Sequence, residues 1–275
     1  MPEMPEVETM VRDLTPRVVG HTITAVDAPF RGSVVYPDFE EFETRATGKI
    51  ITAVERRGKF ALFSLSSGDV LIVHRGMTGS LLLRPSNVEM DPYTRLILAL
   101  DGGEELRFRD PRKFGKVFLM DPSGAERALP WAHFGPEPLN GAFTVPAFRR
   151  ALSGRTAPIK PLLLNQRVVA GLGNIYVDEA LFLARIHPER PAGSLTPAEV
   201  KRLHTAIRDT LAAAIDRRGT TFDNYTDIEG RAGGFQDSLQ VFRRGGEPCP
   251  RCRGPLTRTV LQGRGTHFCA RCQRA

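Results

Sequence analysis

The sequence predicts an α+β protein in which an N-terminal β-sandwich flanked by helices precedes a helical C-terminal half. Two observations lead to this fold class. Short apolar segments separated by Gly, Asp, Ser and Pro turn residues fill residues 22–120, and helical periodicity takes over after residue 144. A third observation adds a small C-terminal module, because all four cysteines fall within residues 241–275.

The first predicted element is a helix that begins near Pro5 and buries apolar residues three or four positions apart. Gly20 is expected to close this helix, although Pro16 could end it sooner. The apolar residues at helical spacing are Val7, Met10, Val11 and Leu14. Eight short strands follow, at 22–26, 49–54, 60–65, 70–74, 80–83, 94–100, 105–109 and 116–120.

The clearest helix of the second half opens at the capping box Thr196-Pro197-Ala198-Glu199 and ends at Arg217-Arg218-Gly219. Residues 219–240 are rich in glycine and long for a simple connection, so a functional loop is predicted there. The chain is also long enough to exceed one ordinary domain. The predicted segments are an N-terminal domain (1–125), a linker (126–143), a helical domain with the loop (144–240) and the cysteine module (241–275).

The net charge of +7 is concentrated at the C-terminal end of the chain. Residues 241–275 hold eight arginines, no lysine and one acid, Glu247, so residues 1–240 sum to zero. Arginine clusters suit phosphate groups, because each guanidinium offers a rigid fork of donors and neutralised phosphates release counterions. No apolar run approaches the ~20 residues that span a bilayer, and the acidic, proline-rich start is unlike a signal peptide. We therefore expect a cytosolic (cytoplasmic) protein without a membrane partner.

The cysteines form two pairs, Cys249/Cys252 and Cys269/Cys272, each with two intervening residues. Two such pairs, with sixteen residues between them, can place four thiolates tetrahedrally around one zinc ion. Two disulfides are the alternative, which a reducing cytosol disfavours. Four thiolates leave no open coordination position, so the prediction is one structural Zn²⁺ rather than a catalytic one.

Met1-Pro2 is a start from which methionine is commonly removed, because the second residue is small. Taken alone, a proline at this position carries no functional information. A free N-terminal proline is nevertheless a secondary amine, partly unprotonated near neutral pH, which can attack an electrophilic sugar carbon and form an iminium ion. Glu3 and Glu6 lie close by in the sequence and could supply an acid.

Six segments carry a resemblance to a known family. They are PEMPEVET (2–9), RRGK (56–59), HRGMTGS (74–80), DPRKFG (110–115), NQRVVAGLGNIY (165–176) and GRGTHFC (263–269). In this order they resemble the formamidopyrimidine-DNA glycosylase family, the bacterial 8-oxoguanine repair enzymes. The resemblance implies a bifunctional glycosylase and AP lyase that removes oxidised purines from double-stranded DNA and nicks the strand by β,δ-elimination. It also implies a helix-two-turns-helix domain and a β-hairpin zinc finger.

The resemblance assigns four catalytic residues. Pro2 would attack C1′ of the damaged nucleotide, and Glu3 would be the general acid that helps to open the sugar ring. Lys59 would hold a phosphate and assist proton transfer, and Arg264 would contact a phosphate and aid δ-elimination. Without the matching segments, Lys59 would be a surface lysine and Arg264 one more arginine in a basic tail.

The family also implies residues that bind DNA and fill the space left by an extruded nucleotide. Met77 would be an apolar plug, Arg112 would face the orphaned base, and Phe114 would be an aromatic wedge. Taken alone, Met77 and Phe114 would be assigned to the core. The implied contacts with the DNA backbone are Asn174 and Arg155.

Three positions depart from the family pattern. Met4 replaces a commoner leucine, which conserves volume. Arg75 stands where an apolar residue is expected beside the plug and could add a phosphate contact. The segment Tyr93-Thr94-Arg95 lacks the histidines often found there, and Arg95 could make the DNA contact in their place.

Two alternatives remain open. The endonuclease VIII branch of the superfamily acts on oxidised pyrimidines, but it usually has glycine in place of Met4. The long 219–240 loop also favours the first function, as a cover for an extruded purine. A non-catalytic zinc-ribbon protein that senses distorted duplex would not require Pro2, Glu3 and Lys59. A monomer is expected, since the sequence gives no signal for an oligomer.

Overall fold

A computed structural model of the chain describes residues 2–121, 133–222 and 225–274. The chain forms two compact units. The N-terminal unit comprises Met1–Ala132 and Arg217–Gln236, and the C-terminal unit comprises His133–Asp216 and Asp237–Ala275. Most of the 219–240 segment, which was predicted with the helical domain, thus packs with the N-terminal unit. The predicted linker, 126–143, lies partly outside the described residues.

Helix α1 (Met4–Val18) opens the N-terminal unit, with Pro5 in its first turn as predicted. Pro16 does not end the helix, which continues to Val18. Val18 is fully buried beyond the proline, so apolar burial offsets the backbone hydrogen bond that Pro16 cannot donate. Gly20 follows the helix with a φ of 91°, a left-handed conformation that glycine adopts without strain.

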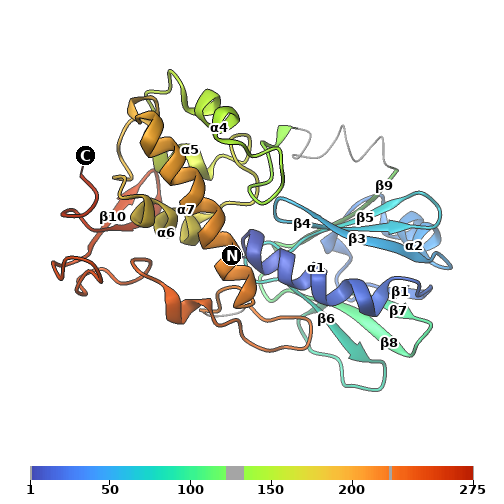
Figure 1. Cartoon of the computed structure of the whole chain (residues 1–275). Coiled ribbons are helices and arrows are strands. Elements are labelled where there is room, and N and C mark those ends of the chain that lie inside the picture. The colour runs from blue at the N-terminus through green and yellow to red at the C-terminus, as the bar shows by residue number, and fades with distance from the viewer. Residues whose placement is uncertain (1, 122–132, 223–224, 275) are drawn as a thin grey trace. The chain divides into compact units, whose positions relative to one another are not determined.

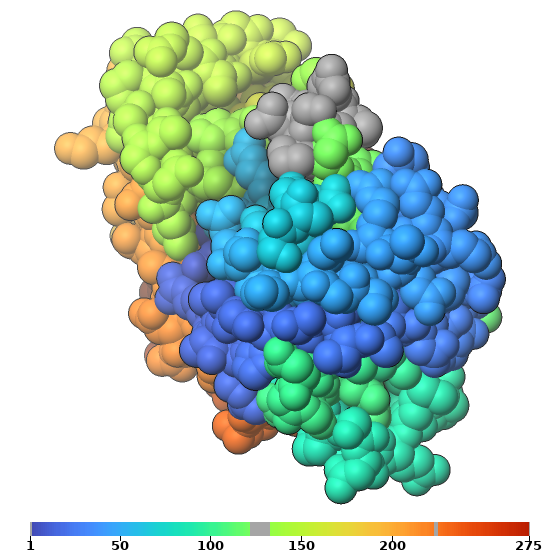
Figure 2. Space-filling model, turned by 90° about the vertical axis from the view of Figure 1, so that its right-hand side faces the viewer, coloured from blue at the N-terminus to red at the C-terminus, as the bar shows by residue number. Residues whose placement is uncertain are grey.

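Two sheets make up most of the N-terminal unit (Figure 1). The antiparallel four-stranded sheet has the order β1 (Ile23–Asp27), β7 (Thr94–Leu100), β8 (Glu104–Arg109) and β6 (Ser80–Pro85). The five-stranded sheet has the order β2 (Val34–Tyr36), β9 (Lys116–Met120), β5 (Val70–His74), β4 (Phe60–Leu65) and β3 (Ile51–Arg57). All its neighbours are antiparallel except β2 and β9. In the space-filling view, segments from this unit coloured blue to green form a continuous surface (Figure 2).

All eight predicted strands are present, and four of them (60–65, 70–74, 94–100 and 116–120) have the predicted bounds. The prediction missed β2 and helix α2 (Phe39–Ala46). β2 has only three residues, and none of them is fully buried, so it carries no alternating pattern. Helix α2 did have a signal, because the Asp38 carboxylate accepts a hydrogen bond from the Glu41 N–H, 2.9 Å away, as an N-cap.

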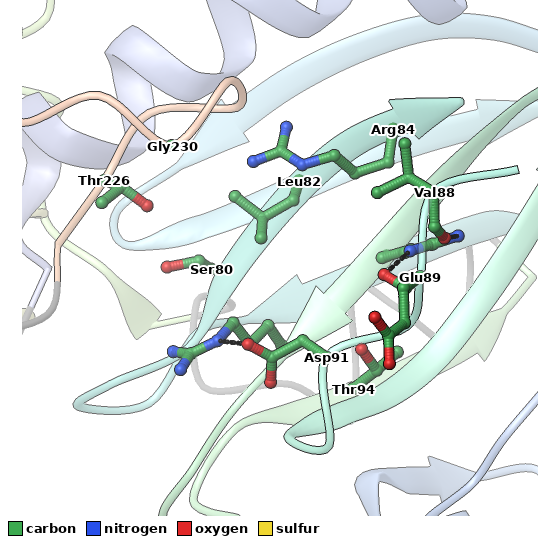
Figure 3. Close-up of a pocket in the computed structure, with 11 residues that line it drawn as sticks. Ser80, Leu82, Arg84, Val88, Glu89, Asp91, Thr94, Thr226 and Gly230 are labelled. Atoms are coloured by element: carbon green, nitrogen blue, oxygen red, sulfur yellow. Dashed lines mark hydrogen bonds and ion pairs between the residues drawn. The ribbon is translucent and has the colours of Figure 1, made fainter. Parts of the chain in front are cut away.

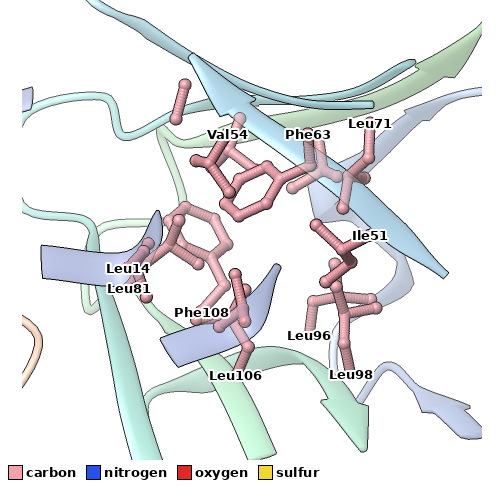
Figure 4. Packing of buried hydrophobic residues seen from close by; sticks show 14 of the residues in the cluster. Leu14, Ile51, Val54, Phe63, Leu71, Leu81, Leu96, Leu98, Leu106 and Phe108 are labelled. Atoms are coloured by element: carbon pink, nitrogen blue, oxygen red, sulfur yellow. The ribbon is translucent and has the colours of Figure 1, made fainter. Parts of the chain in front are cut away.

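One apolar core joins α1 and both sheets. Figure 4 shows side chains of the five-stranded sheet facing those of the four-stranded sheet. The labelled residues are Ile51, Val54, Phe63 and Leu71 from the first, Leu81, Leu96, Leu98, Leu106 and Phe108 from the second, and Leu14 from α1. This shared core confirms the predicted sandwich. The loops described below connect strands of these two packed sheets.

The C-terminal unit is built on helices, as predicted. They are α4 (Val145–Leu152), α5 (Ile159–Leu164), α6 (Asn174–Ala184) and α7 (Pro197–Asp216). The predicted capping box opens α7, because Thr196 and Glu199 exchange hydrogen bonds between side chain and backbone. The hairpin β10 (Thr257–Leu261) and β11 (Arg264–Phe268) packs against α6.

Three single turns of 3₁₀-helix complete the described elements. They are η1 (Arg31–Ser33), η3 (Ala192–Ser194) and η4 (Phe235–Ser238). Among the described residues, no helix combines the length and apolar character that a membrane span requires. The α+β class, with sheets first and helices with a cysteine module second, is confirmed.

Candidate functional site

The start of the chain is fixed inside the N-terminal unit. Pro2 is buried, and Glu3, only 2% exposed, is the N-cap of α1. The Glu6 carboxylate accepts hydrogen bonds from the Glu3 N–H (2.6 Å) and from the Thr220 N–H (2.8 Å). Because a helix N-terminus favours negative charge, this position suits both carboxylates. One side chain thus ties Glu3 to the 217–236 segment.

Gly219 makes this contact possible. Its φ is 80°, and a Cβ there would lie 2.9 Å from Cγ of Glu6. A larger residue would therefore be strained and would push the Glu6 carboxylate away from Thr220. The sequence analysis noted Glu6 as a nearby acid, but nothing in the sequence pairs it with a residue more than 200 positions away.

Lys59 lies in the two-residue turn between β3 and β4, where Gly58 adopts a φ of 58°. The positive charge of Lys59 affects the pKa of His74, the last residue of β5. Burial, followed by the charges of Lys59 and Lys116, lowers the pKa of His74 to about 4. His74 is therefore neutral near pH 7, and its ring packs on Phe60 with centroids 4.7 Å apart. The sequence analysis gave His74 no role, although it stands at the head of the Met77 segment.

The predicted plug and wedge lie on adjoining loops and are exposed rather than buried. Met77 is 43% exposed and Phe114 is 49% exposed, and the Arg112 guanidinium lies 4.6 Å from the centre of the Phe114 ring. A Cβ on Gly76 would come within 2.7 Å of the Phe114 backbone, so only glycine lets the loops approach this closely. Exposed apolar side chains at this point contradict a core role and fit contact with another molecule.

Asp110 holds the two loops together. It is fully buried and accepts hydrogen bonds from Thr78 Oγ1 (2.5 Å) on the Met77 loop and from the Gly115 N–H (2.7 Å) on its own loop. It also accepts a longer bond of 3.3 Å from the Arg112 N–H. Removing such a carboxylate would leave several buried donors unsatisfied. The Asp110 carboxylate thus links the loop that carries Met77 to the loop that carries Arg112 and Phe114.

Two arginines of this region are more buried than the sequence suggested. Arg95 is 9% exposed and donates from Nε to the Asp110 carbonyl at 2.8 Å. Its guanidinium supports the Asp110 loop, and its contact with DNA stays a prediction. Arg75 is 2% exposed, and this burial contradicts the suggestion that it could add a phosphate contact. Burial of a guanidinium is not visible in a sequence, because arginine is normally at the surface.

A polar pocket of about 410 Å³ lies between the four-stranded sheet and the 217–236 segment, within the N-terminal unit (Figure 3). Thr226 and Gly230 form one wall. Arg84 donates to the carbonyls of Ile228 and Glu229, and Arg109 pairs with Asp91 at 2.8 Å. The pocket contains none of the predicted site residues. Its arginines are engaged with protein groups, and one of them, Arg84, bonds the segment to β6.

In the C-terminal unit, Asn174 begins α6 and donates from Nδ2 to the Gly265 carbonyl at 2.9 Å. Lys160 donates to the same carbonyl at 2.8 Å and forms a buried ion pair with Asp178 at 2.6 Å. Asp178 in turn accepts a hydrogen bond from the His267 N–H. These bonds clamp β11 to helices α5 and α6. The lysine and aspartate were not predicted, since each looks like an ordinary helix residue in the sequence.

The two other predicted contacts of this unit are exposed. Arg264 is the first residue of β11, directly after the turn Gln262-Gly263, whose φ angles of 48° and 73° fit a two-residue hairpin. Arg155 follows α4 at the surface. Both arginines are exposed, unlike Arg75, so their guanidinium groups can contact a phosphate.

The four cysteines form a metal site. Their sulfur atoms all lie within 4.8 Å of one another, and the Cys249–Cys272 and Cys252–Cys269 distances are 3.9 Å and 3.5 Å. Zinc bound tetrahedrally by thiolates puts neighbouring sulfurs roughly 3.8 Å apart. The cysteines are free rather than joined as disulfides. Their arrangement fits one structural zinc ion, as predicted.

Comparison with known proteins gives matches along the whole chain. Models of the formamidopyrimidine-DNA glycosylase N-terminal domain, of its H2TH domain and of the zinc finger found in FPG and IleRS match residues 1–117, 134–226 and 246–275. The formamidopyrimidine-DNA glycosylase of Symbiobacterium thermophilum is 49% identical over 99% of this chain and 89% of its own length. That of Geobacillus kaustophilus is 44% identical over the full length of both proteins.

Solved structures agree with these relatives. A Lactococcus lactis FPG variant in complex with DNA that contains Fapy-dG has a TM-score of 0.93 and 37% identity, with both chains covered completely. The MutM (FPG) protein of Thermus thermophilus has a TM-score of 0.88 and 45% identity, over 99% of this chain and 98% of that one. The chain therefore belongs to the formamidopyrimidine-DNA glycosylase family, whose enzymes act on damaged DNA.

Proposed function

We propose that this protein is a bifunctional DNA glycosylase and AP lyase that removes oxidised purines, chiefly 8-oxoguanine and formamidopyrimidines. The observation that carries the proposal is the fixed start of the chain. Pro2 and Glu3 are buried at the N-terminus of α1, and Glu6 holds the Glu3 backbone and Thr220. A nucleophile and an acid held in one place meet the geometric demand of covalent catalysis.

The proposed reaction begins after removal of Met1. The Pro2 nitrogen attacks C1′ and the bond to the damaged base breaks, with the departing base taking up a proton. Glu3 protonates the ring oxygen O4′, so that the sugar opens and an iminium ion joins Pro2 to C1′. The iminium acidifies the C2′–H. Loss of that proton expels the 3′-phosphate in β-elimination, and a further proton loss expels the 5′-phosphate in δ-elimination.

Two further residues are proposed to assist this reaction. Lys59 does so as a cation, and His74 does so as a neutral imidazole. Lys59 in the β3–β4 turn supplies a phosphate contact and assists the proton transfers of β-elimination. His74 is neutral near pH 7, because burial and the nearby lysines lower its pKa. It can therefore accept or donate a hydrogen bond without repelling the lysine.

The exposed loops supply the means of extruding a nucleotide. Met77 fills the vacated space, Arg112 contacts the orphaned base and Phe114 unstacks the neighbouring step. Their support by the buried Asp110 favours this role, since an intercalating side chain must resist being pushed back. The proposed contacts with phosphate come from Asn174, Arg155, Arg95 and Arg264. The partner is double-stranded DNA, and the protein acts as a monomer.

A paired cleavage assay tests the substrate. We expect a duplex with 8-oxoguanine opposite cytosine to be cleaved about tenfold faster or more than a duplex with thymine glycol. The comparison is needed because a Lactococcus lactis FPG structure is a complex with DNA that contains an oxidised pyrimidine. Faster cleavage of thymine glycol would instead assign the protein to the endonuclease VIII type of activity. Binding of both duplexes without cleavage would favour the non-catalytic alternative.

Arg264→Ala should stop the reaction after β-elimination and weaken DNA binding. Loss of one phosphate contact should also reduce the slope of log affinity against log salt by about one. The products are separated on a denaturing gel, and the affinity is measured at several salt concentrations. Arg258→Ala on the paired strand β10 is the matched control, because it removes the same charge from an exposed position of the hairpin. Equal behaviour of both variants would show that only general charge matters.

A further inference from the structure

Arg75 is the largest side chain that is fully buried in the described part of the chain. A buried guanidinium is costly, because it leaves water with a full charge. Burial lowers the pKa of Arg75, and the electrostatic effects of Tyr225 and Glu6 act in the opposite direction. One of its nitrogens, Nη1, has no hydrogen-bond partner among the described residues. An apolar residue would pack here at lower cost, so the arginine requires an explanation in its contacts.

On one side, Arg75 closes the turn that carries Met77. Its Nε donates to the Gly79 carbonyl at 2.8 Å, and the Gly79 N–H donates back to the Arg75 carbonyl at 2.9 Å. A weaker bond of 3.4 Å joins Nη2 to Ser80 Oγ. A Cβ on Gly79 would lie 2.2 Å from the Arg75 carbonyl oxygen, so the turn is packed as tightly as glycine allows.

On the other side, the guanidinium faces the Tyr225 ring, whose centre lies 5.1 Å from Cζ. Tyr225 is buried and bonds to other residues of the 217–236 segment. Its hydroxyl donates to the Arg218 carbonyl at 3.0 Å, and its own carbonyl accepts from Thr221 Oγ1 at 2.9 Å. The Thr221 hydroxyl oxygen then accepts the Gly233 N–H at 2.9 Å. Arg75 thus contacts a residue that bonds to two other positions of the segment, Arg218 and Thr221.

We propose that Arg75 is a positioning residue that couples the Met77 turn to the 217–236 segment through Tyr225, and that this coupling promotes removal of a damaged base. The inference rests on the proposed glycosylase function. Extruding a nucleotide inserts Met77 and places a base that must be held. A contact between the Met77 turn and the 217–236 segment would make insertion of Met77 and placement of the segment around the base occur together. An abasic site has no base to hold, so strand cleavage there does not depend on the link.

The proposal predicts a selective defect. Arg75→Met keeps the side-chain volume but removes the charge. It should slow excision of 8-oxoguanine about tenfold, the loss expected for a desolvated cation–π contact. Cleavage of a duplex with a preformed abasic site should change less than about twofold. Tyr225→Leu should give the same selective loss. Tyr225→Phe loses the hydroxyl bond to Arg218 but keeps the ring, so it should keep the wild-type ratio of the two activities.

A double-mutant cycle and a matched control separate coupling from general damage. Because the two residues act through one contact, the double variant Arg75→Met/Tyr225→Leu should be no slower than either single variant. Arg107→Met is the control. Arg107 is also buried, but its hydrogen bonds go to Glu105 and to the carbonyls of Val88 and Glu89, none of which belongs to the segment, so it should leave the ratio of the two activities unchanged.

Three results would overturn the proposal: an equal loss of both activities in Arg75→Met, an unchanged ratio in Tyr225→Leu, or additive effects in the double variant. If Arg75→Met does not fold, the Tyr225 pair decides alone, since leucine and phenylalanine differ only in keeping the aromatic ring. A wild-type protein that cleaves neither duplex would reject the proposed function itself, which is a distinct outcome.

Discussion

Replacing Pro2 with glycine, or keeping Met1 in front of it, should abolish the covalent complex that borohydride traps on a duplex with 8-oxoguanine. A retained Met1 turns the nitrogen of Pro2 into an amide, which is not a nucleophile. Glycine leaves a primary amine, whose imine must be protonated to activate the sugar, and it lacks the ring that restricts the backbone. For a group that forms the covalent bond, the loss of excision should reach at least about 10³-fold.

The control for this experiment is Pro5→Ala. It also removes a proline from the first turn of α1, but no step of the proposed reaction involves Pro5. This variant should trap as well as the wild type, provided that its melting temperature is similar. Efficient trapping by the variant that retains Met1, in which the Pro2 nitrogen is an amide, would show that another amine is the nucleophile, and Lys59 would be the next residue to test.

Removing the zinc ion should unfold the β10–β11 hairpin and abolish tight binding of DNA. Few apolar residues support this module: Val241, Leu256 and Cys249 pack with Cys269 and with Phe182 of α6. A segment this short rarely folds without a metal, and structural zinc contributes about 10–16 kcal/mol in small fingers. Without the hairpin, Arg264 loses its fixed position. The expected change in affinity is therefore much larger than that of Arg264→Ala.

The zinc prediction is tested with Cys249→Ala and with chelated wild-type protein. Metal analysis should give one zinc ion per wild-type chain and none in the variant, and a gel-shift assay should show the loss of binding in both. Adding zinc back should restore binding to the chelated wild type but not to the variant. Zinc-free protein that binds DNA with the original affinity would mean that the finger does not need its metal.

The sequence predicted the parts of the fold whose signals are local. Strands such as 60–65 and 94–100 have continuous apolar runs between turn residues, and the capping box at Thr196 marked the start of α7 directly. β2 escaped because three half-exposed residues carry no period. The 219–240 segment was predicted as a loop, but its packing with the N-terminal unit depends on contacts such as Glu6 to Thr220, which no local pattern encodes.

In the candidate site, too, the features with a local sequence signal could be predicted, and those that depend on distant contacts could not. The cysteine spacing alone was sufficient to predict the metal site, because the geometry of four thiolates around zinc dictates that spacing. The exposure of Met77 and Phe114 followed from the family resemblance, since composition alone would bury both. Burial of Arg75 and Arg95 could not be predicted. An arginine in the interior depends on partners such as Asp110 and Tyr225, which the fold brings together from distant positions.

The most direct test of the central claim is mass spectrometry of the borohydride-reduced complex after proteolysis. We predict that the sugar adduct lies on the N-terminal peptide, that this peptide starts at Pro2, and that fragmentation places the added mass on the proline nitrogen. An adduct on Lys59, or on a peptide that still begins with Met1, would contradict the proposed chemistry.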